Sequence, residues 1–176
     1  MTDFSEESWK ILGDCLTERK FEKGDILLKT GEICNSIFFV SSGYCKAFYN
    51  QDGKEINTAF YFEYDFATNT KSLTIGLKSE YEIIACEKLT VIAFDKTGLL
   101  NAYKKSQEIE TFGRKLLEII VSKQEEHSNG FKLLTPKQRY ENLTLTQPKF
   151  LQRVSLTQTA SYLGMSRETL SRFRKK

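Results

Sequence analysis

The sequence predicts an α+β fold: an antiparallel β-roll of jelly-roll type, then a long helix, then two short helices at the C-terminus. Short apolar runs alternate with turn residues between residues 19 and 95, and an apolar stripe at helical spacing follows within residues 97–128. A basic block with helix-capping patterns completes the sequence. We therefore divide the chain into a β-roll domain (1–96), a helix (97–131) and a basic helical domain (132–176).

The composition is that of a globular protein, with 40% apolar and 28% charged residues among 176. No apolar run exceeds four residues, and the acidic start lacks the apolar segment of a secretory signal, so we expect a cytoplasmic protein without a membrane helix. The net charge of +3 is unevenly distributed. Residues 1–131 carry 16 Lys/Arg and 21 Asp/Glu, whereas residues 132–176 carry 10 and 2. A basic block of this kind predicts a polyanionic partner, nucleic acid before membrane.

The residues that metal and redox centres require are sparse. The single histidine, His127, lies in a polar stretch, where we expect it to be solvated. No metal-ligand spacing links the four cysteines, which we expect to be free thiols: Cys15, Cys34, Cys45 and Cys86. We also find no nucleophile, phosphate-loop or zinc-protease motif. The sequence therefore predicts neither a metal, nor a cofactor, nor an enzyme.

The residue pattern of the first half of the chain predicts a short helix followed by β-strands. Apolar residues at helical spacing predict a helix over residues 4–17. Short strands separated by glycines follow, and Asn50–Gly53 is the strongest hairpin turn among them. Ten of the 22 aromatic residues fall between Phe38 and Phe66. Core packing is their commonest role, and a ligand pocket is the alternative.

The helix that follows carries a narrow apolar stripe. Ile109, Phe112, Leu116 and Ile119 are spaced three, four and three residues apart and are flanked by charged residues. This pattern favours a dimer interface, with packing against the β-roll as the alternative. We expect the helix to break at Asn129–Gly130.

The most informative segment is 155–173. Ser155 and Gln158 form a capping-box pattern for one helix, Gly164 suits its end, and Ser166 suits the start of another. Two short helices around a glycine turn predict a helix-turn-helix. The sizes of its core positions agree, apart from Thr159, which stands where an aliphatic residue is expected: Ala160, Leu163, Met165, Leu170 and Phe173.

The second of these helices presents polar side chains on one face. Arg167, Glu168, Ser171 and Arg172 are adjacent there and lie off the core positions. Arginine donates two hydrogen bonds to guanine, and glutamate accepts one from cytosine. The face therefore predicts base recognition in DNA.

Taken together, these features resemble the cyclic-AMP receptor protein/fumarate–nitrate regulator (Crp/Fnr) family of bacterial transcription factors. The order of elements agrees, and Ala160–Gly164 is similar to Bacteroidetes-type members. The other segments that carry the resemblance are Lys23-Gly24-Asp25, Gly31-Glu32, Ser42-Gly43, Asp52-Gly53 and Met165–Arg172.

The resemblance implies a homodimer that binds double-stranded DNA. Arg167, Glu168 and Arg172 would read bases, with Ser171 on the same face. The hydroxyls that would hold phosphates are Ser155, Thr157, Ser166 and Thr169. Two recognition helices would enter successive major grooves about 34 Å apart. A small effector and RNA polymerase are further candidate partners.

The sensor half departs from the cyclic-nucleotide members of that family. Their cassette uses a Glu for the ribose and an Arg for the phosphate, whereas this chain aligns Asn69 and Ser79 at those positions. A buried phosphate without its arginine lacks charge compensation, so we do not expect cyclic AMP to bind. The pocket would take another small effector or none. Its candidate residues are Tyr61, Thr68, Asn69, Thr70, Ser79 and Tyr81.

As a second departure, we expect no β-hairpin wing after Phe173. DNA contact would then rest on the recognition helix and on Lys137, Arg139 and Arg153. The alternative to a DNA-binding regulator is a small-ligand-binding β-roll whose basic tail docks a protein partner. A cupin-like metalloenzyme is the third alternative, and it ranks last because this chain lacks the histidines that such a metal site needs.

Overall fold

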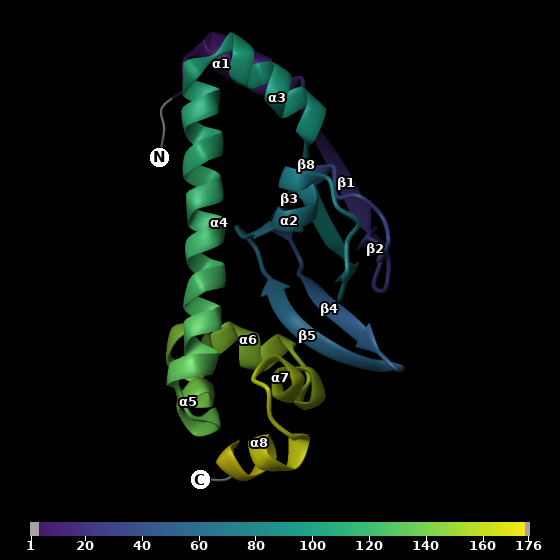
Figure 1. Ribbon diagram of the computed structural model, residues 1–176, viewed down its shortest axis with the longest axis vertical. Coiled ribbons are helices and arrows are strands. Elements are labelled where there is room, and N and C mark those ends of the chain that lie inside the picture. Colours follow the sequence, from purple (N-terminus) through teal and green to yellow (C-terminus); the bar gives the residue numbers. More distant parts are fainter. Residues whose placement is uncertain (1–3, 175–176) are drawn as a thin grey trace.

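A computed structural model describes residues 4–174 as a β-roll with helices at both ends (Figure 1). The strands are β1 (Leu16–Phe21), β2 (Ile26–Leu28), β3 (Ser36–Ser42), β4 (Cys45–Gln51), β5 (Lys54–Tyr61), β6 (Phe66–Ala67), β7 (Glu82–Ala85) and β8 (Leu89–Asp95). The helices are α1 (Glu6–Gly13), α2 (Thr70–Ile75), α3 (Lys96–Lys105), α4 (Gln107–Leu133), α5 (Pro136–Thr146), α6 (Pro148–Arg153), α7 (Leu156–Tyr162) and α8 (Arg167–Arg174). Residues 1–3 and 175–176, which belong to the first and last predicted domains, lie outside the described residues.

The strands form two four-stranded sheets, in the orders β1-β8-β3-β6 and β2-β7-β4-β5, and every pairing is antiparallel. The predicted hairpin is confirmed: Gln51 pairs with Lys54, and Asp52 and Gly53 both take positive φ, of 53° and 81°. Two such residues form the turn whose twist matches antiparallel strands. The antiparallel roll predicted from the apolar runs is therefore correct.

The N-terminal helix is shorter than predicted. Ser5 caps α1 by accepting a hydrogen bond from the Ser8 amide, and the helix ends at Gly13. Leu16, which the helical spacing assigned to the same face, instead opens β1 opposite Phe94. Pairing with β8 overrides the helical pattern at that position.

The long helical region is two helices that meet at Ser106. This residue is extended, with φ −143°, and its hydroxyl accepts from the Ile109 amide, so it ends α3 and caps α4. The predicted break at Asn129–Gly130 is wrong, because α4 continues to Leu133. Tertiary contact explains the continuation: the rings of His127 and Phe131, on either side of the break, lie 5.1 Å apart and pack against the chain beyond the helix.

We call residues 136–174 the C-terminal module. Its four helices lie below the β-roll at the end of α4 (Figure 1). Thr135 and Gln138 form a capping box at the start of α5, and Pro136 and Pro148 stand in the first turns of α5 and α6. The prolines therefore explain why two short helices occur here instead of one long one.

Two apolar clusters hold the chain together. The larger fills the β-roll and extends to α1, α3 and the first half of α4. The smaller joins the C-terminal module to β4 and β5, where Tyr44, Phe60 and Phe62 meet Phe150 and Tyr162. The C-terminal module therefore packs directly on the sheet.

Candidate functional site

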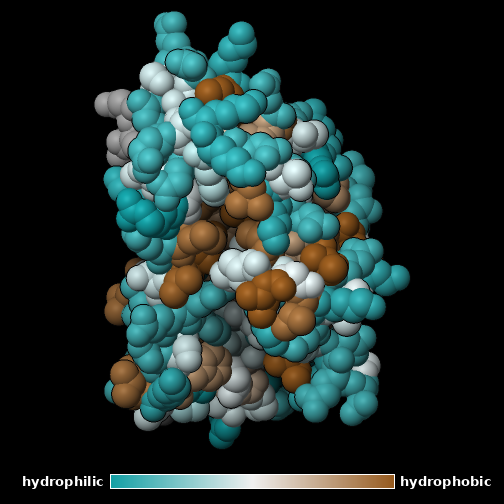
Figure 2. Space-filling model, turned by 45° about the horizontal axis from the view of Figure 1, so that its top comes forward, coloured by the Kyte–Doolittle hydropathy of each residue, from teal (hydrophilic) through white to brown (hydrophobic). Residues whose placement is uncertain are grey.

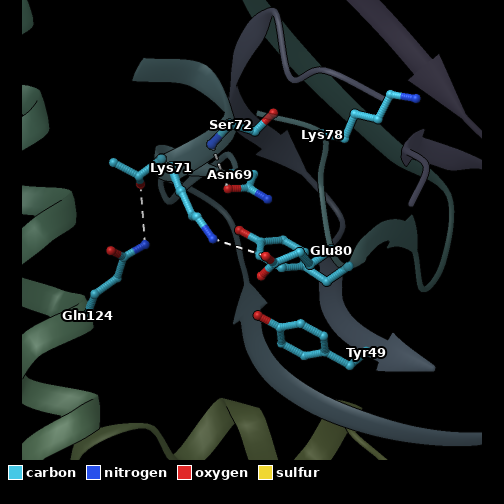
Figure 3. Close-up of a pocket in the computed structure, with 9 residues that line it drawn as sticks. Tyr49, Asn69, Lys71, Ser72, Lys78, Glu80 and Gln124 are labelled. Atoms are coloured by element: carbon cyan, nitrogen blue, oxygen red, sulfur yellow. Dashed lines mark hydrogen bonds and ion pairs between the residues drawn. The ribbon is translucent and has the colours of Figure 1, made fainter. Parts of the chain in front are cut away.

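A small cavity of about 160 Å³ lies where α2 faces β4, the start of β7 and the middle of α4 (Figure 3). Its lining residues are Tyr49, Asn69, Thr70, Lys71, Ser72, Lys78, Glu80, Tyr81 and Gln124. The rings of Tyr49 and Tyr81 meet edge to face, with centroids 5.5 Å apart. Three of the predicted pocket residues, Asn69, Thr70 and Tyr81, line this cavity.

The polar groups at its base are already paired with one another. Asn69 caps α2 by accepting from the Ser72 amide at 3.0 Å, and it donates to the Ser79 hydroxyl at 2.9 Å. Ser79 donates in turn to the carbonyl oxygen of Tyr81 at 2.6 Å. The Tyr81 hydroxyl donates to the carbonyl oxygen of Thr68, and burial raises the pKa of this phenol. These hydrogen bonds therefore stabilise the loop, and the hydroxyls of Ser79 and Tyr81 both donate within it.

The charges at the cavity mouth do not suit a phosphate. Lys71 pairs with Glu80 at 3.0 Å, and both side chains are more than half exposed. The carboxylate of Glu80 repels an anion at the same place where Lys71 attracts one. On the α4 side, Gln124 donates to the Thr70 hydroxyl at 3.3 Å (Figure 3). Figure 3 also shows Lys78 extending away from this group.

A much larger groove, of about 1020 Å³, opens between β5, α4 and the C-terminal module. Figure 2 shows apolar side chains gathered in a hollow on one face of the molecule. The groove is lined by rings that include Phe60, Phe62, Phe131, Phe150 and Tyr162, and by cationic side chains that include Lys123 and Arg139. Two further predicted pocket residues, Tyr61 and Thr68, line this groove, whereas Ser79 is buried behind the small cavity.

Sequence reasoning did not foresee this groove. Its only signal was the concentration of aromatic residues between Phe38 and Phe66, which core packing explains equally well. Phe131, Phe150 and Tyr162 lie more than 60 residues further along the chain, on α4, α6 and α7. No local pattern brings those segments together.

The end of the chain forms α7, a tight turn and α8. Gly164 takes the left-handed conformation, with φ +63°, and a Cβ there would lie 2.6 Å from the Phe131 ring. Ser166 begins α8 by accepting from the Thr169 amide at 3.2 Å. Thr159, the unexpected polar residue, is buried and donates to the carbonyl oxygen of Ser155 at 2.9 Å. A hydroxyl can therefore occupy this apolar position because its hydrogen bond is made within the helix.

The residues predicted to read bases are exposed on α8. Arg167, Glu168 and Arg172 are exposed, and within residues 4–174 none of them forms an ion pair. Leu170, on the opposite face, is completely buried. The predicted phosphate-holding residues Ser155, Thr157 and Ser166 are also exposed, whereas Thr169 and Ser171 are partly buried. Ser155 and Ser166 also act as helix caps.

Two auxiliary basic residues are not free for DNA in this structure. Arg139 donates to the carbonyl oxygens of Leu134 and Leu163 and lies over the Phe131 ring. Arg153 is held by carboxylates of the β-roll. Lys137 pairs with Glu141 on the surface of α5, at 3.5 Å.

The apolar stripe of α4 is divided between two environments. Ile109 and Leu116 are buried in the core of their own chain and have no surface left for a second copy. Phe112 is half-buried beside Phe4 and Phe94, whereas Ile119 is 54% exposed. The sequence left packing on the β-roll open as an alternative, and that is what Ile109 and Leu116 do.

The structure confirms the prediction for the cysteines but not the prediction for the histidine. All four cysteines are free thiols, Cys45 is fully buried, and burial raises the pKa of Cys86 to about 11. The solvated position expected for His127 is wrong: its ring stacks on Tyr162 at 4.8 Å, and burial lowers its pKa. Among residues 4–174, no three His, Cys, Asp or Glu side chains come together as a metal site. No helix in this part of the chain is both long enough and apolar enough to cross a bilayer.

A β-roll with a capped helix at its cavity, followed by a long helix, defines a class of sensor domain, and comparison with known proteins places the chain within that class. Residues 18–106 match the family described as the cyclic nucleotide-binding domain, and the chain belongs to this family. No curated protein sequence matches the chain significantly.

Solved structures share the fold at low sequence identity. FixK2 from Bradyrhizobium japonicum is similar with a TM-score of 0.76 and 18% identity, over 91% of this chain and 83% of that one. The catabolite activator protein of Thermus thermophilus has a TM-score of 0.60 and 17% identity, over 97% and 82%. A regulator of the crp/fnr family from Eubacterium rectale has a TM-score of 0.68 and 18% identity, over 98% and 82%. The chain therefore has the fold of Crp/Fnr-family transcription regulators.

Proposed function

We propose that this protein is a transcriptional regulator that binds double-stranded DNA in a sequence-specific manner as a homodimer. The observation that carries the proposal is the exposed polar face of α8, where Arg167, Glu168 and Arg172 lie without ion-pair partners among the described residues. Together with α7 and the Gly164 turn, this face forms a helix-turn-helix of the kind that enters the major groove. Such a regulator acts in the cytoplasm, and no step of its action requires catalysis.

The hydrogen-bonding groups of these three side chains suggest which bases each of them recognises. Arg167 and Arg172 can each donate a pair of hydrogen bonds to a guanine, and Glu168 can accept from a cytosine. Hydrogen bonds to its own amide and to Ser166 lower the pKa of Glu168, which keeps it charged as an acceptor. The exposed Thr157 and the cap residues Ser155 and Ser166 would contact phosphates, and their exposure supports this role.

We propose a dimer face on α4 that includes only the exposed part of the apolar stripe. Ile119 and Leu133 are exposed and 14 residues apart, about four helical turns, so they share one face with the half-buried Phe112. Ile109 and Leu116 support that face from the core behind it.

We further propose that the β-roll senses a ligand other than cyclic AMP. None of the described residues that line the small cavity is an arginine, and its Asn69 already donates to Ser79 behind it. The large groove offers aromatic walls with both cations and carboxylates, among them Lys123 paired with Asp65, which suits an apolar ligand with a polar group. The sequence Ala160–Gly164 supports a Bacteroidetes-type member of the regulator family.

The experiment is DNA binding by the Arg167→Ala/Arg172→Ala variant, with Arg114→Ala as the control for a lost surface charge. Arg114 is exposed on α4 and pairs with the exposed Glu118. We expect the double variant to lose at least 30-fold in affinity for its selected site, since each base contact contributes about 1–3 kcal/mol. The control should change the affinity by less than twofold. Equal binding by the double variant and the wild type would favour the alternative, in which the basic tail docks a protein.

A further inference from the structure

The outer edge of one sheet is covered by the C-terminal module. Strand β5 is the last strand of its sheet, so the outward-facing backbone groups of β5 have no strand partner. The amide of Asn57 donates to the Ser161 hydroxyl at 3.0 Å, and that hydroxyl donates to the carbonyl oxygen of Glu55 at 3.1 Å. A single side chain of α7 therefore satisfies one donor and one acceptor that a neighbouring strand would otherwise take.

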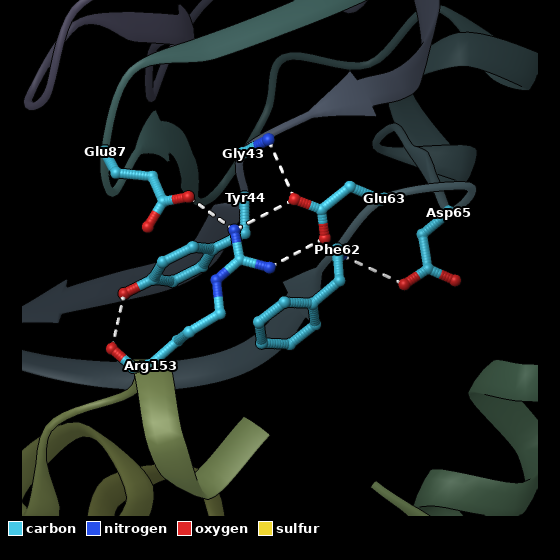
Figure 4. A network of polar contacts seen from close by, with 7 residues as sticks. All are labelled: Gly43, Tyr44, Phe62, Glu63, Asp65, Glu87 and Arg153. Atoms are coloured by element: carbon cyan, nitrogen blue, oxygen red, sulfur yellow. Dashed lines mark hydrogen bonds and ion pairs between the residues drawn. The ribbon is translucent and has the colours of Figure 1, made fainter. Parts of the chain in front are cut away.

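An arginine fastens the same contact at its other end (Figure 4). Arg153, at the end of α6, makes two hydrogen bonds to Glu63, of 2.7 and 3.0 Å, and a further ion pair with Glu87. We call these three side chains the latch. The guanidinium lowers the pKa of Glu63, whose carboxylate also accepts from the Gly43 amide at 2.9 Å.

The rings around the latch fix the direction of the arginine. Its guanidinium carbon lies 5.0 Å from the ring centroid of Tyr44 and 5.3 Å from that of Phe62. The Tyr44 hydroxyl donates to the backbone carbonyl of Arg153 at 3.1 Å, so side chain and backbone are both held. A Cβ on Gly43 would lie 2.3 Å from the Lys88 carbonyl oxygen, so the loop carrying the Glu63 partner packs without spare room.

A groove nevertheless remains open on one side of the contact between the C-terminal module and the sheet. The groove of about 1020 Å³ is lined by Glu63 and Arg153 and by the rings of Phe60, Phe150 and Tyr162. The covalent connection between α4 and α5 is only Leu134–Thr135. The module is therefore tied to α4 by a short connector and by side-chain contacts, in which Arg139 lies over the Phe131 ring and Tyr162 stacks on His127. A molecule in the groove would touch Glu63 and Arg153 of the latch directly.

We propose that the latch is a releasable clamp that holds the C-terminal module on the edge of β5 and so sets how α8 is presented. The presentation of α8 to DNA rests on the proposed function. The clamp itself does not, because it concerns only the docking of the module on the sheet. Release exposes the edge of β5 and frees the module to turn about residues 134–135.

The test is hydrogen exchange in the Glu63→Gln/Glu87→Gln variant of the full chain. Glutamine keeps the size of each side chain and leaves an oxygen for the Gly43 amide, but it removes both charges that face Arg153. The reporter is the Asn57 amide, whose partner belongs to the module. The control variant is Glu118→Gln, which breaks an exposed pair with Arg114 on α4. The control amide is Val91, in the middle of the other sheet.

We expect the Asn57 amide to exchange about tenfold faster in the double variant, with Val91 unchanged and the control variant like the wild type. An Asn57 rate within twofold of the wild type would overturn the proposal, because the arginine pairs would then not hold the module. Equal acceleration at Val91 would also overturn it, because the pairs would then support the whole fold.

The same variant separates this inference from the proposed function. We expect its affinity for the selected DNA site to change at least threefold, since α8 is no longer held in one orientation. Faster exchange at Asn57 with unchanged affinity would overturn the role of the latch in presenting α8. If the wild-type protein shows no sequence-specific DNA binding, the proposed function is overturned, whereas the exchange result at Asn57 still stands.

Discussion

At the scale of single residues, Lys46 is the clearest conflict between burial and charge. Its side chain is 2% exposed near the start of β4, where it pairs with Glu55 and its ammonium lies 4.7 Å from the centroid of the Phe48 ring. A buried ammonium is tolerated only with such a partner. Because Glu55 is 46% exposed, water also reaches the pair from its outer side.

This geometry predicts opposite results for the two halves of the pair. Glu55→Ala should lower the free energy of unfolding by about 2 kcal/mol, because it leaves the Lys46 charge buried without its partner. Lys46→Met should change it by less than about 1 kcal/mol, since an apolar chain of similar length replaces the ion. Urea denaturation of both variants checks this. Equal losses would show that the charge is not the cause.

His127 makes stability depend on pH. Burial against Tyr162 lowers its pKa below the ordinary value of 6.5, so the unfolded chain binds a proton at this site before the folded chain does. The stability that the neutral ring contributes is present above pH 6.5 and is lost as the pH falls through the folded pKa.

We therefore expect wild type to lose more stability than His127→Phe between pH 7.5 and pH 5. The carboxylates titrate equally in both proteins, so the difference between the two denaturation curves isolates the histidine. Parallel pH profiles would contradict this assignment.

At the scale of elements, the turn between α7 and α8 depends on one glycine. Gly164→Ala places a Cβ at φ +63° and 2.6 Å from the Phe131 ring, so we expect a loss of about 2 kcal/mol in a thermal or urea melt. The matched control is Gly130→Ala. That glycine is inside α4 with nothing within 4 Å of its Cβ position, so alanine should stabilise the helix by about 0.8 kcal/mol. Similar effects of both substitutions would refute the turn geometry.

The dimer face is tested by Ile119→Asp. This substitution places a charge on the exposed side of α4 and leaves the core residues Ile109 and Leu116 untouched. We expect the apparent mass in analytical ultracentrifugation to fall from that of two chains to that of one. The variant should remain folded, with a thermal unfolding midpoint close to that of the wild type. A variant that stays dimeric would place the interface elsewhere.

The elements that local patterns specify were predictable from the sequence, and those that depend on distant contacts were not. The Asp52-Gly53 hairpin, the Thr135 cap and the Gly164 turn follow from the conformations these residues favour. The continuation of α4 through Gly130 depends instead on packing of His127 and Phe131 against one another and the module. The same holds for the latch, because Arg153 and Glu63 are 90 residues apart.

At the scale of the whole molecule, the uneven charge of the chain acquires a structural basis. Four of the ten basic residues in the last 45 positions fall into two sets. Arg139 and Arg153 hold the C-terminal module together and on the sheet, whereas Arg167 and Arg172 face outward on α8. We infer that the first set positions the second, and that a change at the sheet edge reaches α8 through the module as a rigid body.

The central claim is that two copies of α8 read DNA across a two-fold axis. Selection of bound sequences from random duplex DNA by the wild-type protein tests it most directly. We predict enrichment of a pseudo-palindrome whose half-site centres are about 10 base pairs apart, or a multiple of that turn, with binding that weakens steeply as salt rises. Enrichment of no sequence, or of a single half-site without its symmetric partner, would contradict the claim.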